Sequence, residues 1–398
     1  MTRSRLGWLD GLRGYAALVV VCFHLSPSVL GPGPHQAIFR HLDLGKYGVL
    51  LFFLVSGYVI PMSLERHGSL RRFWIGRLFR IYPAYLATIA VAVAIGGWRG
   101  GAGHGGVLAH ATMLLDPLGL RGAVRVFWTL SYEMIFYLVV AGLFAWRLHR
   151  HSGWWASGLA LIALLAGPSL PDGLFAGRWT AAVLLVLVGG SIAAHLAGRH
   201  RTAGVVGICF VLLPALNAHP TARSTVLASW QGLLLLAVMF AGTVVYRAQH
   251  GLLRPLPAGL ALGVVAGCLV AASPAHALWA ATTGAVAATF ALAYAVRNRP
   301  IPRGLSFLGR VSYSLYLLHI PVLMLLGRLV PSLAGRPVGV RIAVGTAFLA
   351  LALSVAWASY RLVELPGQRA GRALAARFAA TERAATRTGR GENVGASV

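Results

Sequence analysis

Two ionisable residues, Arg13 and His24, interrupt a largely apolar stretch that runs from Leu9 to Leu25. They are about three helical turns apart, so their side chains share one face of a helix and lie roughly 16 Å apart along its axis. Ionisable groups are costly in lipid, so this face should meet a protein-lined or aqueous interior and carry a functional role. A purely structural interpretation stays open for both residues. In this interpretation Arg13 extends to the lipid headgroups and His24 makes an interhelical hydrogen bond.

A carboxylate, Glu133, lies well inside another apolar stretch, residues 126–146. If that segment enters the membrane from outside, Glu133 lies roughly 10 Å below the outer boundary. The segment that carries His24 enters from the inside, and its rise places His24 roughly 9 Å below the same boundary. A segment that starts near residue 306 on the inside places His319 at a similar depth. Equal depth predicts a shared polar chamber in the outer half of the bundle. A bundle histidine with satisfied hydrogen bonds is the alternative for His319.

An imidazole and a carboxylate at one depth can act as a general base and the group that orients it. In this hypothesis Glu133 holds the tautomer of His24, whose other nitrogen takes a proton from an incoming hydroxyl. Cys22 points to another side of the helix, and no serine or cysteine nucleophile is required. Ser56, followed by Gly57, favours close helix packing, with a substrate-facing role as the second interpretation.

A basic cluster precedes and enters the third apolar stretch; it consists of Arg71, Arg72, Arg77 and Arg80. Arg77 and Arg80 are spaced i,i+3, so on a helix they present guanidinium groups on one side, where they suit a phosphorylated ligand. Ordinary anchoring of a cytoplasmic loop explains the same residues equally simply.

The composition is that of a multi-pass membrane protein. Of 398 residues, 58% are hydrophobic and only 11% are charged, and the mean hydropathy is +0.73. The net charge of +26 comes from arginines in short clusters between apolar runs, which is typical of cytoplasmic loops and argues against nucleic-acid binding. The first apolar run resembles a signal peptide but has no convincing cleavage site. The three cysteines have no paired spacing, so neither a disulfide framework nor a metal site is expected.

The apolar runs predict an all-α bundle of about 10–12 transmembrane spans. The number of spans is given as a range partly because the run at 202–217 is short for a transmembrane helix. The runs are 10–30, 46–63, 80–97, 126–146, 153–171, 179–197, 202–217, 226–246, 257–273, 276–296, 306–328 and 339–362.

Arginine-rich loops alternate with poorer ones, which places both termini and residues 64–79 in the cytoplasm and residues 99–125 outside. Arg336 and Arg341, in the last outer loop, break this pattern. The outer segment should hold a short surface or re-entrant helix near 107–115. Residues 1–366 then form the membrane domain, and 367–398 form a basic cytoplasmic tail that is partly disordered.

Six motifs, in order along the chain, together resemble the integral-membrane acyltransferase family 3. That family moves acyl groups onto sugars, lipopolysaccharide, Nod factors, peptidoglycan or macrolides. The matching residues are Arg13 with His24, Phe52–Gly57, Arg77–Tyr85, Trp128–Tyr137, Ser312–His319 and Tyr360–Pro366.

The resemblance implies that acyl-CoA, expected to be acetyl-CoA, is the donor. Its phosphates would bind the cytoplasmic arginines, and His24, Glu133 and Arg13 would act in catalysis. No permanently bound cofactor and no metal are expected. The partners would be the donor, a hydroxylated glycan or metabolite and the bilayer, and a homo-oligomer is left open. The residues expected to bind substrate are Ser56, Trp128, Tyr316 and His319.

We therefore expect an O-acyltransferase in which the pantetheine arm passes Arg13 and brings the thioester to His24. Arg13 would steady either the donor or the thioester carbonyl. The rival hypothesis is a proton-coupled secondary transporter, in which the same ionisable residues relay protons or bind substrate. Transporters usually contain duplicated segments, and this sequence contains no duplicated motif.

Overall fold

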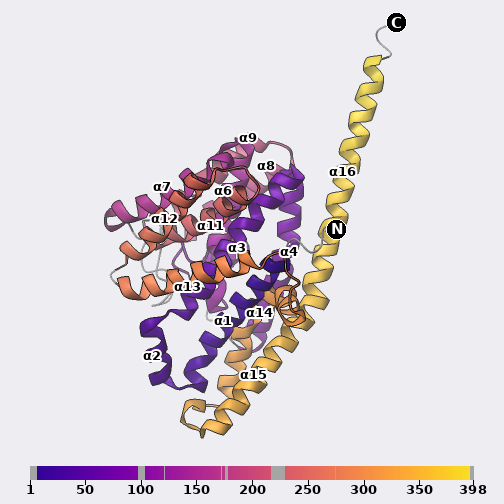
Figure 1. Ribbon diagram of the computed structural model, residues 1–398. Helices are drawn as coiled ribbons and strands as arrows, with labels where there is room; N and C mark the ends of the chain where they lie inside the picture. Colours follow the sequence, from indigo (N-terminus) through magenta and orange to yellow (C-terminus); the bar gives the residue numbers. More distant parts are fainter. Residues whose placement is uncertain are drawn as a thin grey trace.

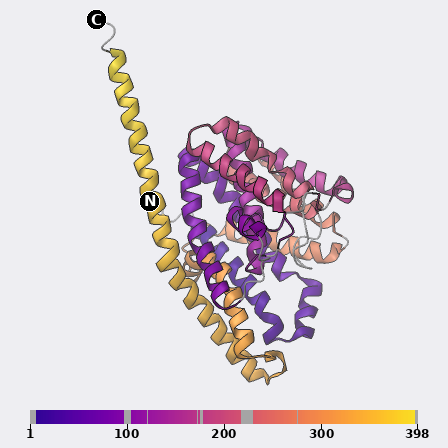
Figure 2. The same cartoon turned by 180° about the vertical axis from the view of Figure 1, so that it is seen from behind.

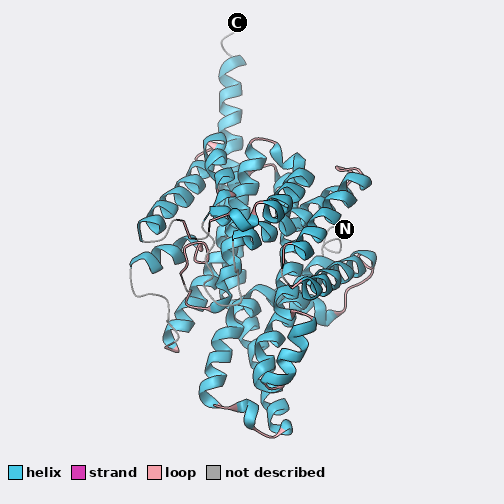
Figure 3. Cartoon of the chain, turned by 90° about the vertical axis from the view of Figure 1, so that its left-hand side faces the viewer, coloured by secondary structure: helices cyan, strands magenta, loops and turns pink. Residues whose placement is uncertain are grey.

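The computed structural model describes residues 7–96, 104–120, 122–171, 173–174, 178–216, 229–273 and 275–394. Throughout these residues every regular element is helical (Figure 3). The helices pack into one bundle, and the last helix runs along its edge and projects beyond it (Figure 1). The expected all-α, multi-pass architecture is confirmed.

The first half of the chain holds α1 (Gly7–Val29), α2 (Pro32–His41), α3 (Leu44–His67), α4 (Leu70–Ala94), α5 (His104–Thr112), η1 (Arg125–Phe127), α6 (Trp128–Ala145), η2 (Leu148–His151), α7 (Ser152–Leu165), η3 (Gly167–Ser169) and α8 (Arg178–Leu196). The second half holds α9 (His200–Cys209), α10 (Leu212–Leu216), α11 (Ser229–Gln249), α12 (Pro255–Ala271), α13 (His276–Ala295), α14 (Arg303–Leu329), η4 (Leu333–Gly335), α15 (Val338–Ser359), η5 (Tyr360–Glu364) and α16 (Leu365–Val394).

Among the described residues, nine helices are long and apolar enough to cross a membrane. Three of the predicted runs hold shorter helices: α7 has 14 residues, α9 has 10 and α12 has 17. A helix of 14 residues covers roughly 21 Å of a hydrocarbon core about 30 Å thick. The predicted count of about 10–12 spans therefore includes helices that are too short to cross the core by length alone.

Glycines bring the central helices into backbone contact. A Cβ added to Gly14 of α1 would lie 2.5 Å from the amide nitrogen of Gly309 on α14. On α3, a Cβ on Gly57 would overlap the backbone of Met239 on α11. Small residues are the usual means by which membrane helices approach this closely. The α1–α14 contact places Arg13 and His24 on a helix that faces His319.

The C-terminal helices α15, η5 and α16 are continuous, and α16 lies beside α4 (Figure 2). The π-helical turn η5 ends two residues before Pro366, which cannot donate the amide hydrogen bond of a regular helix. The predicted domain boundary at 366 therefore falls inside a helix. Residues 395–398 of the predicted tail lie outside the described residues.

Candidate active site

His24 and His319 lie side by side on α1 and α14. Nε2 of His319 is 3.2 Å from Nδ1 of His24, and their ring centroids are 5.2 Å apart. His319 is fully buried, and its Nδ1 lies 3.2 Å from the carbonyl oxygen of Leu315. Two histidines that the sequence placed at one depth are thus in direct contact.

The partners of His319 determine which nitrogen of each neutral ring carries the proton. A carbonyl oxygen only accepts, so Nδ1 of His319 donates to Leu315 and Nε2 of His319 is left as an acceptor. Nδ1 of His24 then donates, shared between His319 and the carbonyl oxygen of Val20 at 3.0 Å. Nε2 of His24 is left as an unprotonated base that bonds with no described residue.

Glu133 belongs to a second cluster, on the face of α6 that meets α4. Tyr137 donates a short hydrogen bond to its Oε1. The guanidinium group of Arg77 lies 5.4 Å from the centroid of the Tyr137 ring. No hydrogen bond joins Glu133 to His24, although the structure describes both. It therefore does not bring the predicted base and its orienting carboxylate together.

Aromatic side chains connect Arg13 to the histidine pair. The hydroxyl of Tyr316 lies 2.9 Å from Oγ1 of Thr129, and its ring centroid is 6.0 Å from that of His319. The same ring stacks on Phe52, again with 6.0 Å between centroids. The guanidinium group of Arg13 lies 5.3 Å from the Phe52 centroid. A continuous series of side chains thus runs from Arg13 to His319.

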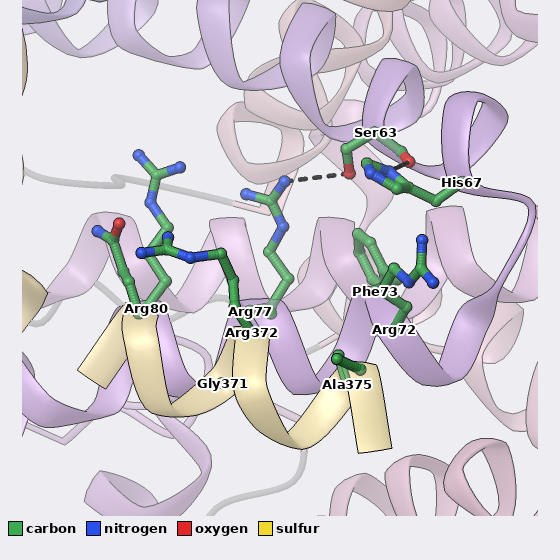
Figure 4. Close-up of a pocket in the computed structure, with 12 residues that line it drawn as sticks. Ser63, His67, Arg72, Phe73, Arg77, Arg80, Gly371, Arg372 and Ala375 are labelled. Carbon is green, nitrogen blue, oxygen red and sulfur yellow. Dashed lines mark hydrogen bonds between the residues drawn. The ribbon is translucent and has the colours of Figure 1, made fainter. Parts of the chain in front are cut away.

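A cavity of about 450 Å³ lies between the end of α3, the first half of α4 and the start of α16 (Figure 4). Three of the predicted phosphate-binding residues, Arg72, Arg77 and Arg80, line it. Arg77 is only 9% exposed and donates to Oγ of Ser63 at 3.2 Å. Because Arg77 also packs on Tyr137, it lies between the cavity and Glu133.

Arg71, the fourth predicted phosphate-binding residue, does not line this cavity. Its Nε donates to the carbonyl oxygen of Leu196 at 2.7 Å, and its guanidinium group lies 5.3 Å from the centroid of Phe378. These contacts tie α4 to α8 and α16. The structure brings together three of the four predicted arginines.

Ser56 and Trp128 have different surroundings. Ser56 is 2% exposed and has no hydrogen-bond partner among the residues that the structure describes, and its neighbour Gly57 accepts a hydrogen bond from Oγ1 of Thr243 at 2.9 Å. This environment favours the packing interpretation of Ser56. Trp128 begins α6, away from the arginine cavity, and Nζ of Lys46 lies 5.2 Å from its ring centroid.

The sequence interpretation missed two charged residues near this site. Glu364, in η5, is 3% exposed and accepts hydrogen bonds from Ser314 at 3.0 Å and Gln368 at 3.1 Å. The signal was present, because Glu364 belongs to the last of the six motifs. Arg372 of α16 lines the cavity and was assigned to the tail. Within the described part of the chain, no group of three or more histidine, cysteine or acidic residues could hold a metal ion.

A comparison with protein families matches residues 6–361 to a family described as an acyltransferase domain. This match covers most of the chain. The protein belongs to this acyltransferase family. The family match contains both histidines, Glu133 and the arginines of α4, whereas Glu364 lies just beyond it. The tail residue Arg372 lies beyond it.

Several curated proteins are similar to part of this family member. Acyltransferase MdmB of Streptomyces mycarofaciens is 32% identical over 148 residues, which cover 34% of this chain and 38% of that protein. Peptidoglycan O-acetyltransferase OatA of Listeria monocytogenes is 29% identical over 160 residues, 35% of this chain and 24% of that protein. Exopolysaccharide production protein ExoZ of Rhizobium meliloti is 31% identical over 169 residues, 38% of this chain and 51% of that protein.

The aligned regions thus span between about a quarter and a half of these relatives' lengths. No solved structure matches the chain.

Proposed function

We propose that this multi-pass membrane protein is an O-acyltransferase that moves an acyl group from acyl-CoA, in the first place acetyl-CoA, to a hydroxyl of a glycan, glycolipid or glycosylated metabolite. Two observations support this most strongly. The arginine cavity offers guanidinium groups for phosphates, and the histidine pair, to which side-chain contacts run from Arg13, offers an unprotonated imidazole nitrogen.

The donor enters from the cytoplasmic side in this proposal, with both termini on that side. Arg72, Arg77 and Arg80 hold the phosphates, because guanidinium groups bind phosphate oxygens through paired hydrogen bonds. The pantetheine arm extends past Arg13 toward His24, a distance of roughly 16 Å along α1. Arg13 steadies the donor on this path.

His24 is the general base. Its Nε2 takes the proton of the acceptor hydroxyl while the hydroxyl oxygen attacks the thioester carbonyl. The tetrahedral intermediate then collapses, the carbon–sulfur bond breaks, and the CoA thiolate leaves and takes up the proton from the imidazolium. His319 is a positioning residue, because it accepts the Nδ1 hydrogen of His24 and so directs Nε2 toward the substrate.

Glu133 has a different role from the one expected for an orienting carboxylate. Its charge acts on Arg13 and Arg77, the two buried arginines between the cavity and the histidines. Buried charges need partners, so Glu133 and Tyr137 keep these guanidinium groups in place along the donor's path. This makes Glu133 necessary for donor positioning in the proposal.

The acceptor class is supported by the similar proteins. OatA is named as acting on peptidoglycan and ExoZ as acting in exopolysaccharide production. Both names concern extracellular polysaccharides, and His24 lies near the C-terminal end of α1, whose N-terminal end is cytoplasmic in this proposal. We therefore propose an acceptor hydroxyl that reaches His24 from the extracytoplasmic side.

Transfer of label tests the proposed function. The purified protein, reconstituted in vesicles, is given acetyl-CoA labelled in the acetyl group together with cell-envelope extract or candidate glycosides. We expect label in an acceptor and a stoichiometric release of free CoA. An acceptor that takes no label from acetyl-CoA but is acylated by the same protein when another activated acyl donor is supplied would contradict the proposed donor.

A further inference from the structure

The arginine cavity has a wall that comes from the C-terminal helix. Besides the α4 arginines, its lining includes Gln368, Gly371 and Arg372 of α16. Figure 4 shows Arg372 extending from α16 toward the side of the cavity where Arg80 lies. The arginines of α4 and Arg372, which are about 300 positions apart in the sequence, therefore line the same cavity.

Two glycines hold α16 at this distance from α4. A Cβ added to Gly367 would lie 2.8 Å from the carbonyl oxygen of Phe79, and one added to Gly371 would lie 2.6 Å from Cβ of Phe79. No side chain fits at either position without a shift of the helices. Arg372 directly follows Gly371, so this close contact fixes the position along α4 at which the side chain of Arg372 enters the cavity lining.

The charges around the cavity are unbalanced. Its lining holds four arginines and a histidine but no carboxylate; they are Arg72, Arg77, Arg80, Arg372 and His67. The guanidinium groups of Arg72, Arg80 and Arg372 make no hydrogen bond or ion pair within the described residues. Like charges from two helices repel across such a space, and a polyanion would relieve that repulsion.

We propose that Arg372 binds the nucleotide phosphates of acyl-CoA together with Arg77 and Arg80, so that α16 is a wall of the donor site. This inference rests on the proposed function and adds a binding residue and a structural element to it. The segment that sequence analysis assigned to a cytoplasmic tail is then required for donor binding from Gly367 through Arg372.

Charge variants of α16 test this inference on the full-length protein. Arg372→Glu should weaken binding of CoA, measured by calorimetry in detergent, by about tenfold or more, because it removes a charge-assisted contact. The apparent KM for acetyl-CoA should rise by a similar factor while kcat changes little. Arg372→Lys should restore most of the affinity. The matched control is Arg369→Glu, which makes the same charge change at an exposed α16 position outside the cavity.

A second variant separates a binding role from a folding role. Arg372→Gln removes the charge without adding a carboxylate, and it should keep the wild-type melting temperature while losing CoA affinity. Combined with Arg80→Gln, its penalty should be smaller than the sum of the two single penalties if both residues bind one phosphate group.

The outcomes distinguish this inference from the proposed function. If the wild-type protein does not bind CoA, the proposed donor is wrong and the inference fails with it. If the wild type binds CoA and both Arg372→Glu and Arg372→Gln bind it equally well, the role of α16 is overturned and the proposed donor stands. Equal losses in Arg369→Glu and Arg372→Glu would show that only the overall charge matters, and would also overturn it.

Discussion

Nε2 of His319 accepts a hydrogen bond from Nδ1 of His24 at 3.2 Å, and this contact between α1 and α14 leaves Nε2 of His24 unprotonated. The two histidines cannot exchange their donor and acceptor roles, because Nδ1 of His319 already donates to the carbonyl oxygen of Leu315. His24 is thus the base, and His319 holds it in the reactive tautomer.

The first prediction concerns His319 as a positioning residue. His319→Ala should lower kcat at least about tenfold, because His24 loses the acceptor that selects its tautomer. His319→Gln keeps an acceptor oxygen in reach of His24 and should recover part of the rate. Steady-state kinetics with acetyl-CoA should show KM unchanged in both variants. A KM rise with unchanged kcat would place His319 in donor binding instead.

The second prediction separates Glu133 from the histidine pair. Glu133→Gln should destabilise the protein, because it removes a buried negative charge that favours the charged forms of the buried Arg13 and Arg77. Its melting temperature in detergent should fall by more than that of Tyr137→Phe, which removes only the hydrogen bond to Glu133. Transfer should also fall, with an increase in KM for the donor. A Glu133→Gln protein with wild-type stability and a pure kcat defect would favour a direct role in proton transfer.

The third prediction concerns the α4 arginines. Arg77→Glu with Arg80→Glu should raise the KM for acetyl-CoA far more than it lowers kcat, which is the effect of lost uniform binding. Removing the donor's 3′-phosphate should mimic this defect in the wild type and matter little in the double variant. Arg66→Glu, an exposed charge reversal outside the cavity, is the control. Simple addition of the two penalties would mean that the nucleotide binds elsewhere.

The fourth prediction concerns topology. Single cysteines introduced into residues 64–79 and into α16 of a cysteine-free variant should react with membrane-impermeant maleimide only from the cytoplasmic side. Cysteines in residues 104–120 should react only from the outside. Labelling of 64–79 from outside would break the path from cytoplasmic acyl-CoA to His24.

The helices were largely predictable, because each predicted apolar run contains at least one helix. Hydropathy depends only on composition along the chain. It therefore did not predict that a turn at Phe210 divides the run at 202–217 between α9 and α10. A run of the right composition therefore need not be one span.

The partners of each site residue were harder to predict than its depth. The rise per residue gave His24, Glu133 and His319 similar depths, but depth does not tell which sides of the helices face each other. That direction depends on the glycine contact between Gly14 and Gly309, which sets α1 against α14. The result is a histidine pair in place of the expected His24–Glu133 pair.

Arg372 was missed for a related reason. The segment around Arg372 is basic and contains apolar residues, a composition that is typical of an interfacial or fraying tail. Only the packing of Gly367 and Gly371 on Phe79 shows that this segment belongs to the cavity. The spacing of these two glycines, four positions apart, was the one available signal in the sequence.

The most direct test of the whole account is the rate of CoA release from acetyl-CoA, in the presence of acceptor, by purified wild type, His24→Ala and His41→Ala. His41 is an exposed histidine at the end of α2 and serves as the control. We predict that His24→Ala lowers kcat by about 10²–10⁴-fold, the usual contribution of a general base, while CoA binding and the melting temperature stay at wild-type values. His41→Ala should behave as wild type. A folded His24→Ala protein that keeps most of the wild-type rate would contradict the account.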